Sequence, residues 1–339
     1  MNLETTVEED EIISEASRVL DRLAPVSRFN QPEHLWSDLV DAGRADMGAN
    51  LEEGILEIAA AAGIFRAAGR HLLTEQLATS AYLLPALAHH VPEAKRAAIT
   101  DRLARAPGVI CGEGRAYAPV VGGPTPGVCF GIEEPFDLYH LDLDDGGRLT
   151  LNVAEGGLER VQPVAGLALS MGHVSPGERS WVAVRLDLDR EGLDRIWRNL
   201  MLLHCAALIG TAEATLTLTR DYTLNRIQFG TPIAGFQAVK HSLADVLAGN
   251  EVAWSALLCA LADGAVSPER ALVARILTVE AAYKAARAGA QFHGGIGFTA
   301  ECDLHYFLKT LVEGAQRFGS TDELGERLGL TVVEEALSC

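Results

Sequence analysis

The sequence predicts a multidomain α+β protein with a helical N-terminal domain, a small middle β domain and a C-terminal four-helix bundle. Apolar residues recur at helical spacing in the first and last parts of the chain. Between these parts, Pro and Gly separate short apolar runs of the kind that form strands. We place the three domains at residues 1–105, 106–188 and 189–339.

The individual elements follow from the same patterns. Residues 1–105 are rich in Ala, Leu and Glu, and turn residues separate their helical runs. Short alternating runs in the middle part predict strands, which we place at 138–141, 149–153 and 181–186. Trp181, which opens the last of these runs, is expected to lie in the core. Long helices are predicted near 193–225, 234–263, 268–291 and 303–316, and their short loops are typical of antiparallel bundles.

The composition excludes several classes of function. The 339 residues contain 28 Lys and Arg against 46 Asp and Glu, and the net charge of −18 opposes binding to nucleic acid or to anionic lipid. The acidic N-terminus lacks the apolar core of a secretory signal, and no uninterrupted apolar run reaches the ~20 residues that cross a bilayer. The six cysteines show no metal-ligand spacing. These features predict a cytoplasmic protein with reduced thiols and no structural metal.

A glycine-rich segment is the most informative stretch of the chain. Residues 291–297 read QFHGGIG, so a polar side chain at a predicted helix end precedes three glycines. Glycine lets backbone N–H groups approach a ligand closely, which is a common way to hold a phosphate. A glycine C-cap between two packed helices is the structural alternative.

A second segment offers cationic and aromatic side chains. Arg226 precedes Phe229 and Gly230 at the end of a long predicted helix, where an arginine can favour the negative end of the helix dipole. The planar guanidinium is also suited to bind a diphosphate. Gln237, His241 and Asp245 follow on one face of the next helix. His241 with Asp245 makes a minimal metal pair, and an interhelical hydrogen bond is the simpler interpretation.

Together, the segments RIQFG at 226–230, FQAVKH at 236–241 and QFHGGIGFTAECDLH at 291–305 resemble the C-terminal domain of acyl-CoA dehydrogenases. These FAD enzymes desaturate acyl-CoA thioesters. The resemblance is strong over about 190–310, fair over the first hundred residues and poor in the middle. It implies that the following residues contact the FAD of a neighbouring subunit: Arg226, Phe229, Gln237, Gln291, Gly294 and Gly295.

The catalytic glutamate of that family is missing from both of its usual positions. Aligned on the Arg226 motif, the first position falls at or next to Leu200, and the second falls at Phe318. Glu301 occupies a position that the family uses for packing. Glu313 stands before the only Glu-Gly pair after the glycine turn, but more than a helical turn from the expected place. The family loop that covers the flavin is matched only by the Glu-Pro of 134–135.

Three functions remain open. The leading hypothesis is an accessory subunit similar to those of the α2β2 acyl-CoA dehydrogenases of actinobacterial steroid side-chain degradation. That resemblance implies FAD as cofactor, a catalytic partner subunit, a bulky and steroid-derived acyl-CoA, and an electron-transfer flavoprotein as acceptor. The alternatives are a stand-alone flavin monooxygenase or other catalyst of the same fold, and a non-catalytic structural pseudoenzyme.

Overall fold

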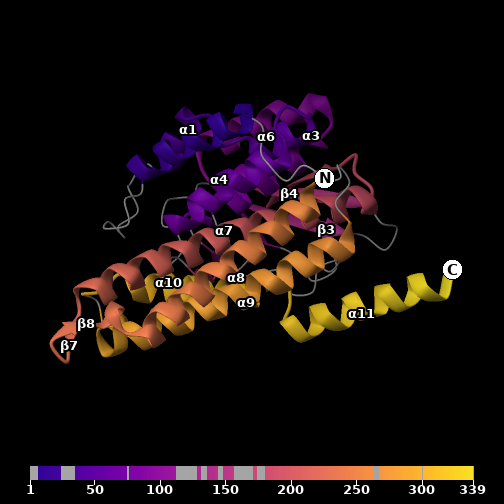
Figure 1. Ribbon diagram of the computed structural model, residues 1–339. Helices are drawn as coiled ribbons and strands as arrows, with labels where there is room; N and C mark the ends of the chain where they lie inside the picture. The colour runs from indigo at the N-terminus through magenta and orange to yellow at the C-terminus, as the bar shows by residue number, and fades with distance from the viewer. Residues whose placement is uncertain are drawn as a thin grey trace.

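The computed structural model of the protein describes residues 7–23, 35–74, 76–111, 128–130, 136–143, 148–155, 171–173, 180–262, 267–299 and 301–338. Helices occupy both ends of the chain and strands its middle, as the sequence predicts (Figure 1). One core of buried side chains runs through all three parts, so the domain boundaries stay a prediction.

The N-terminal part consists of short helices around a buried centre. Its elements are α1 (Val7–Leu23), α2 (Leu35–Asp41), α3 (Met47–Glu52), α4 (Ile58–Arg70), the π-helix η1 (Gln76–Leu83), α5 (Leu84–His89) and α6 (Glu93–Arg105). Helix α4 is the central one, because nine of its 13 residues are buried.

The middle part forms a small sheet. Within the described residues, the order is β1 (Gly108–Cys111), β3 (Asp137–Leu143), β4 (Leu149–Ala154) and β6 (Trp181–Arg185), and only the β1–β3 pair is parallel. A separate pair joins β2 (Val128–Phe130) to β5 (Met171–His173). The three predicted strands are therefore present. Trp181 was wrongly placed in the core: it is half-buried at the start of edge strand β6, of which only Val184 is buried.

The C-terminal part is an antiparallel bundle with a further helix. Its elements are α7 (Arg190–Asn225), β7 (Ile227–Gln228), β8 (Thr231–Pro232), η2 (Ile233–Gly235), α8 (Gln237–Leu261), α9 (Pro268–His293), η3 (Gly294–Phe298), α10 (Leu304–Gln316) and α11 (Thr321–Ser338). Asp189 caps α7 by accepting a hydrogen bond from the backbone N–H of Gly192 at 2.8 Å, and Ser267 caps α9 in the same way.

Backbone contact joins α4 to α7. A Cβ atom on Gly69 would lie 1.8 Å from the carbonyl oxygen of Ala207, and one on Gly210 would lie 1.9 Å from that of Arg66. Only glycine permits such a close approach. Beside this crossing, Glu213 of α7 binds the guanidinium groups of both Arg66 and Arg70. The N-terminal helices are therefore fixed on α7 up to about Glu213, and the last turns of α7 extend beyond them (Figure 1).

Two helices are long and apolar enough to cross a membrane by length and composition alone. The sequence contains no uninterrupted apolar run of this length. The two findings differ because the mean hydropathy over 18 residues can stay high where charged residues interrupt the run. The apolar window of α7 is 78% buried, as in any core helix, whereas that of α8 is only 28% buried. Helix α8 therefore leaves much of its apolar surface uncovered by this chain.

Candidate functional site

The far end of the bundle, opposite the N-terminal helices, collects most of the predicted binding residues. Arg226 follows the last residue of α7, and its backbone carbonyl accepts a hydrogen bond from the N–H of Ile233 at 2.9 Å. That bond closes the β7–β8 hairpin, which projects at this end of the molecule (Figure 1). The Arg226 side chain is exposed, and no hydrogen bond or ion pair holds it among the described residues. Its charge is therefore available to a ligand.

The glycine turn lies at the same end. Helix α9 ends at His293, and Gly294 then takes φ 60° and ψ −141°, a conformation that a residue with a Cβ atom rarely adopts. The ring of His293 stacks on Tyr222 with centroids 4.3 Å apart, and this contact ties the end of α9 to the end of α7. Burial lowers the pKa of His293. An uncharged ring thus brings the Arg226 hairpin and the glycine turn together.

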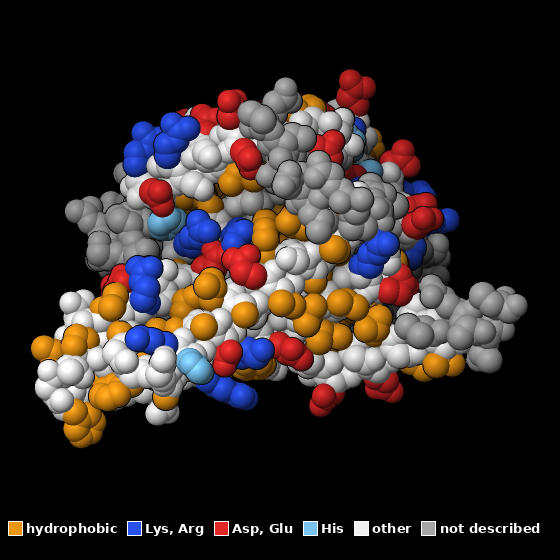
Figure 2. Space-filling view, viewed as in Figure 1, with side chains coloured by type: hydrophobic (Ala, Val, Ile, Leu, Met, Phe, Trp, Pro, Cys, Tyr) orange, Lys and Arg blue, Asp and Glu red, His pale blue; other side chains and the backbone are white. Residues whose placement is uncertain are grey.

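Exposed apolar side chains surround these groups. Phe229 is 92% exposed and has φ 54°, and its ring meets that of Phe236 edge to face at 6.3 Å. Ile227 on the hairpin and Phe298 on the glycine turn are 61% and 67% exposed. Figure 2 shows apolar side chains gathered at this end of the bundle. Clustered exposed aromatic residues are typical of a surface that another molecule covers. We call this end, with residues 226–236 and 291–298, the tip surface.

Two glutamines predicted to bind lie where helices α8 and α9 meet the tip surface. Gln237 is the first residue of α8, and Gln291 lies in the last turn of α9, both exposed. Gln291 also lines a groove of about 700 Å³ between these helices. The same groove is lined by Lys284 and Arg287, which were not predicted as site residues from the sequence. Lys284 and Arg287 precede Gln291 by seven and four residues, which is visible in the sequence, whereas the packing of α8 across the groove is not.

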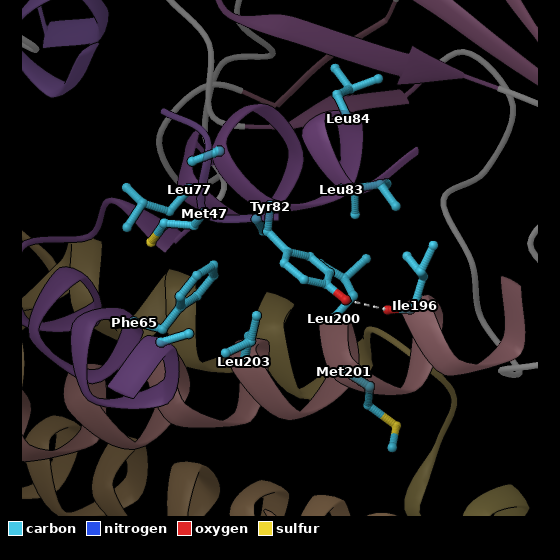
Figure 3. Close-up of a cluster of buried hydrophobic side chains, with 14 of the residues drawn as sticks. Met47, Phe65, Leu77, Tyr82, Leu83, Leu84, Ile196, Leu200, Met201 and Leu203 are labelled. Carbon is cyan, nitrogen blue, oxygen red and sulfur yellow. Dashed lines mark hydrogen bonds between the residues drawn. The ribbon is translucent and has the colours of Figure 1, made fainter. Parts of the chain in front are cut away.

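The first expected position of the catalytic base is closed. Leu200 is only 6% exposed and packs among the apolar side chains where α7 meets the N-terminal helices (Figure 3). Tyr82 fills the adjacent space: it is fully buried, and its hydroxyl donates a hydrogen bond to the carbonyl of Ile196 at 3.0 Å. A substrate has no access to the Leu200 side chain in this arrangement.

The second expected position is equally closed. Phe318 is 7% exposed, with φ 63°, and its ring lies 5.4 Å from that of His204 on α7. The fully buried Arg275 of α9 fixes this segment, since its guanidinium donates to the carbonyl oxygens of Gly314 at 2.7 Å and of Arg317. A cation at the last carbonyls of α10 also complements the helix dipole.

The other acidic candidates do not lie in an enclosed site. Glu301 is fully exposed, and hydrogen bonds from Thr299 and from its own backbone N–H lower its pKa. Glu313 is half-buried on α10. The Glu-Pro of 134–135 falls outside the described residues. Among these residues, no group of three or more His, Cys, Asp or Glu side chains could hold a metal ion.

Comparison with known proteins agrees with this fold. Residues 193–316 match the family profile described as acyl-CoA dehydrogenase, C-terminal domain. The chain is 41% identical over 133 residues to acyl-CoA dehydrogenase IpdE2 of Mycobacterium tuberculosis, a match that covers 39% of this chain and 41% of that protein. It is 36% identical over 129 residues to IpdE2 of Mycolicibacterium smegmatis, covering 38% and 40%. The matched stretch thus spans about two-fifths of either relative.

Solved structures extend the likeness to the whole chain. The ChsE4–ChsE5 complex from Mycobacterium tuberculosis contains a chain that superposes with a TM-score of 0.75 over 98% of this chain and 99% of that one, at 20% identity. Butyryl-CoA dehydrogenase from Megasphaera elsdenii gives 0.73 over 98% and 100%, at 15% identity. The architecture is therefore that of the acyl-CoA dehydrogenases. The match to the C-terminal domain profile over residues 193–316 is consistent with this architecture.

Proposed function

We propose that this chain is a subunit of a heteromeric, FAD-dependent acyl-CoA dehydrogenase and that it helps to hold FAD without supplying the catalytic base. The observation that carries the proposal is a contrast between two parts of the bundle. The tip surface presents Gln291, an open glycine turn and an arginine without a partner among the described residues, and Gln237 follows directly after it. Both positions expected for the base, Leu200 and Phe318, are closed by packed side chains.

The tip surface fits the diphosphate-containing half of FAD. The exposed guanidinium of Arg226 is suited to a diphosphate, because it offers several donors in one plane. No atom outside the immediate chain lies within 4 Å of where a Cβ would stand on Gly294 or Gly295, so a ligand can approach their backbone N–H groups. Bound FAD supplies the flavin that accepts hydride from the acyl chain, and this chain's residues orient its other end.

Because the site in this chain lacks a catalytic base, we infer that the chain assembles with a different subunit. A subunit without a base needs another subunit to remove the α-proton, since a positioned base typically contributes ~10²–10⁴-fold to the rate. The similar ChsE4–ChsE5 structure is a complex of two named chains, and another similar structure is described as a steroid ACAD variant. We propose a catalytic acyl-CoA dehydrogenase chain as partner, a bulky and steroid-derived acyl-CoA as substrate, an electron-transfer flavoprotein as acceptor and a cytoplasmic location.

Flavin content tests the subunit assignment directly. The chain expressed alone is expected to retain much less than one FAD per polypeptide, because the tip surface is an exposed half-site. Coexpression with its catalytic partner should bring the flavin to a fixed ratio in the purified complex. Absorbance at the flavin band against protein concentration measures both values. Full, tightly bound FAD in a homo-oligomer of this chain would contradict the proposal.

Substitution of the remaining acidic candidates tests separately whether this chain carries the catalytic base. Glu313→Gln and Glu301→Gln are each expected to leave turnover of the assembled complex within a few-fold, since we interpret both as structural. Removal of a general base costs about two orders of magnitude or more in kcat. Steady-state kinetics at saturating acyl-CoA separates these outcomes. A hundredfold loss in Glu313→Gln with flavin and assembly intact would show that this chain carries its own base.

A further inference from the structure

Helix α8 leaves a line of side chains uncovered by the rest of the chain. Leu247 lies in the middle of this line and is 51% exposed. Lys240, Ala244 and Glu251 are exposed too, and the four positions follow one another at intervals of four, three and four residues. That spacing places them along one side of a helix. Figure 2 shows apolar side chains along the middle of the bundle, where α8 runs in Figure 1, and we call the four residues the α8 stripe.

The two ends of the α8 stripe carry opposite charges that this chain does not pair. Lys240 and Glu251 have no hydrogen-bond or ion-pair partner among the described residues. They cannot reach each other, because they lie about 16 Å apart along the helix at 1.5 Å per residue. Between them, the exposed side chains of Ala244 and Leu247 are apolar. The stripe therefore has a positive end, an apolar middle and a negative end.

This order of groups is complementary to itself when two α8 helices pack antiparallel. A twofold axis midway between Ala244 and Leu247 sets each alanine level with the leucine of the other copy. The same axis sets Lys240 level with Glu251 of the other copy, so the charge pair forms once at each end. The small alanine leaves room for the leucine between the helices, as a ridge fits a groove. A parallel pair of helices would instead oppose like charges at both ends.

We propose that a second copy of this chain packs on the α8 stripe across this twofold axis. Charge complementarity favours a second copy over an unlike chain, because the sequence of α8 alone supplies both halves of every contact. The contact extends for about 28 Å, since the axis also sets Ser255 level with Phe236, which is 41% exposed at the edge of the tip surface. The inference goes beyond the proposed function, because it joins two like chains and requires no flavin.

The net charge of the chain is the main force against such a contact. Each copy carries a charge of −18, and two molecules of like charge repel each other. At physiological ionic strength the Debye length is about 8 Å, so the charges close to the contact dominate. The charges of the α8 stripe sum to zero, and each lies opposite a charge of the other sign. A dimer is therefore expected at physiological salt.

Sedimentation equilibrium of the purified full-length chain at physiological salt tests the contact. The unaltered chain is expected to form dimers at ~10–100 µM. Lys240→Glu and Glu251→Lys should each weaken dimerisation about tenfold or more, because each sets like charges against one another at two places. Leu247→Glu should have at least as large an effect, since it places two carboxylates in the contact. All three positions are exposed, and far-UV circular dichroism checks that the variants stay folded.

A mixture of the two charge variants separates this contact from general repulsion. Each variant alone carries one sign of charge at both ends of the stripe, whereas a Lys240→Glu chain and a Glu251→Lys chain oppose each other with opposite signs. Mixing them is expected to restore the dimer affinity to within a few-fold of the unaltered chain. The matched controls, Lys284→Glu and Glu280→Lys, make the same charge changes at exposed positions on α9 and should alter the affinity by no more than a few-fold.

The other outcomes overturn the inference. A chain that stays monomeric up to about 100 µM has no such contact. Dimers that tolerate both charge variants use another surface or a parallel arrangement. Equal losses in the α9 controls, without recovery on mixing, would reduce the effect to net charge. A monomeric chain that still holds FAD with its catalytic partner leaves the proposed function standing, whereas a dimer of this chain with full, tightly bound FAD contradicts that function and not this contact.

Discussion

Arg226→Ala is expected to lower the FAD affinity of the assembled complex by about tenfold or more. A hydrogen bond to a charged group contributes about 1.5–3 kcal/mol, and the guanidinium of Arg226 has no competing partner among the described residues. Arg226 carries the only cationic side chain in the described hairpin, residues 226–233, so the substitution removes the only charged donor there. Ultrafiltration followed by flavin fluorescence of the filtrate measures the retained fraction. The effect should appear in FAD retention before it appears in turnover at saturating FAD.

Arg220→Ala provides the matched control. Arg220 lies on α7, six residues before Arg226, and pairs with Asp221 at 2.7 Å, with 58% of its side chain exposed. Its loss removes the same positive charge from the chain without touching the tip surface. Equal FAD affinity in both variants and in the unaltered complex would reduce Arg226 to a charge at a helix end. Equal losses in both variants would indicate general electrostatic attraction in place of a specific contact.

The bundle helices could be predicted from the sequence because each buries a continuous apolar stripe. The expected helix at 193–225 corresponds to α7 (Arg190–Asn225), and that at 303–316 to α10 (Leu304–Gln316). The start of α8 was expected three residues early. There the chain forms the 3₁₀ turn Ile233–Gly235, whose spacing resembles that of a helix, before Gln237 opens α8.

The candidate site was only partly visible in the sequence. Motif residues such as Arg226 and Gln291 are found by their spacing, and the structure brings the segments that carry them to one end of the bundle. Asp245 and Arg287 line one groove only because α8 packs against α9, which no local pattern encodes. In the same way, Leu200 is closed by Tyr82, which lies more than a hundred residues away in sequence. Tertiary packing decides which polar residues face an open groove and which positions are filled.

The closure of the expected base position at Leu200 depends on the backbone contact between α4 and α7. Gly210→Ala is expected to break this contact. The new methyl carbon would stand 1.9 Å from the carbonyl oxygen of Arg66, so the two helices must separate. Overpacking of this kind costs about 1–3 kcal/mol and more where backbone atoms must move. We expect the free energy of unfolding to fall by at least about 2 kcal/mol, measured by urea denaturation with far-UV circular dichroism.

The control for Gly210→Ala is a substitution that is expected to raise the free energy of unfolding. Gly325 is exposed on α11, and nothing lies within 4 Å of where its Cβ would stand. Gly325→Ala should therefore stabilise the protein by about 0.5–1 kcal/mol, because alanine loses less backbone entropy in a helix. A similar gain in Gly210→Ala would mean that α4 and α7 are not in backbone contact. Phe65 of α4 would then not be held against the region of Leu200, and the argument that this chain lacks room for a base would lose its support.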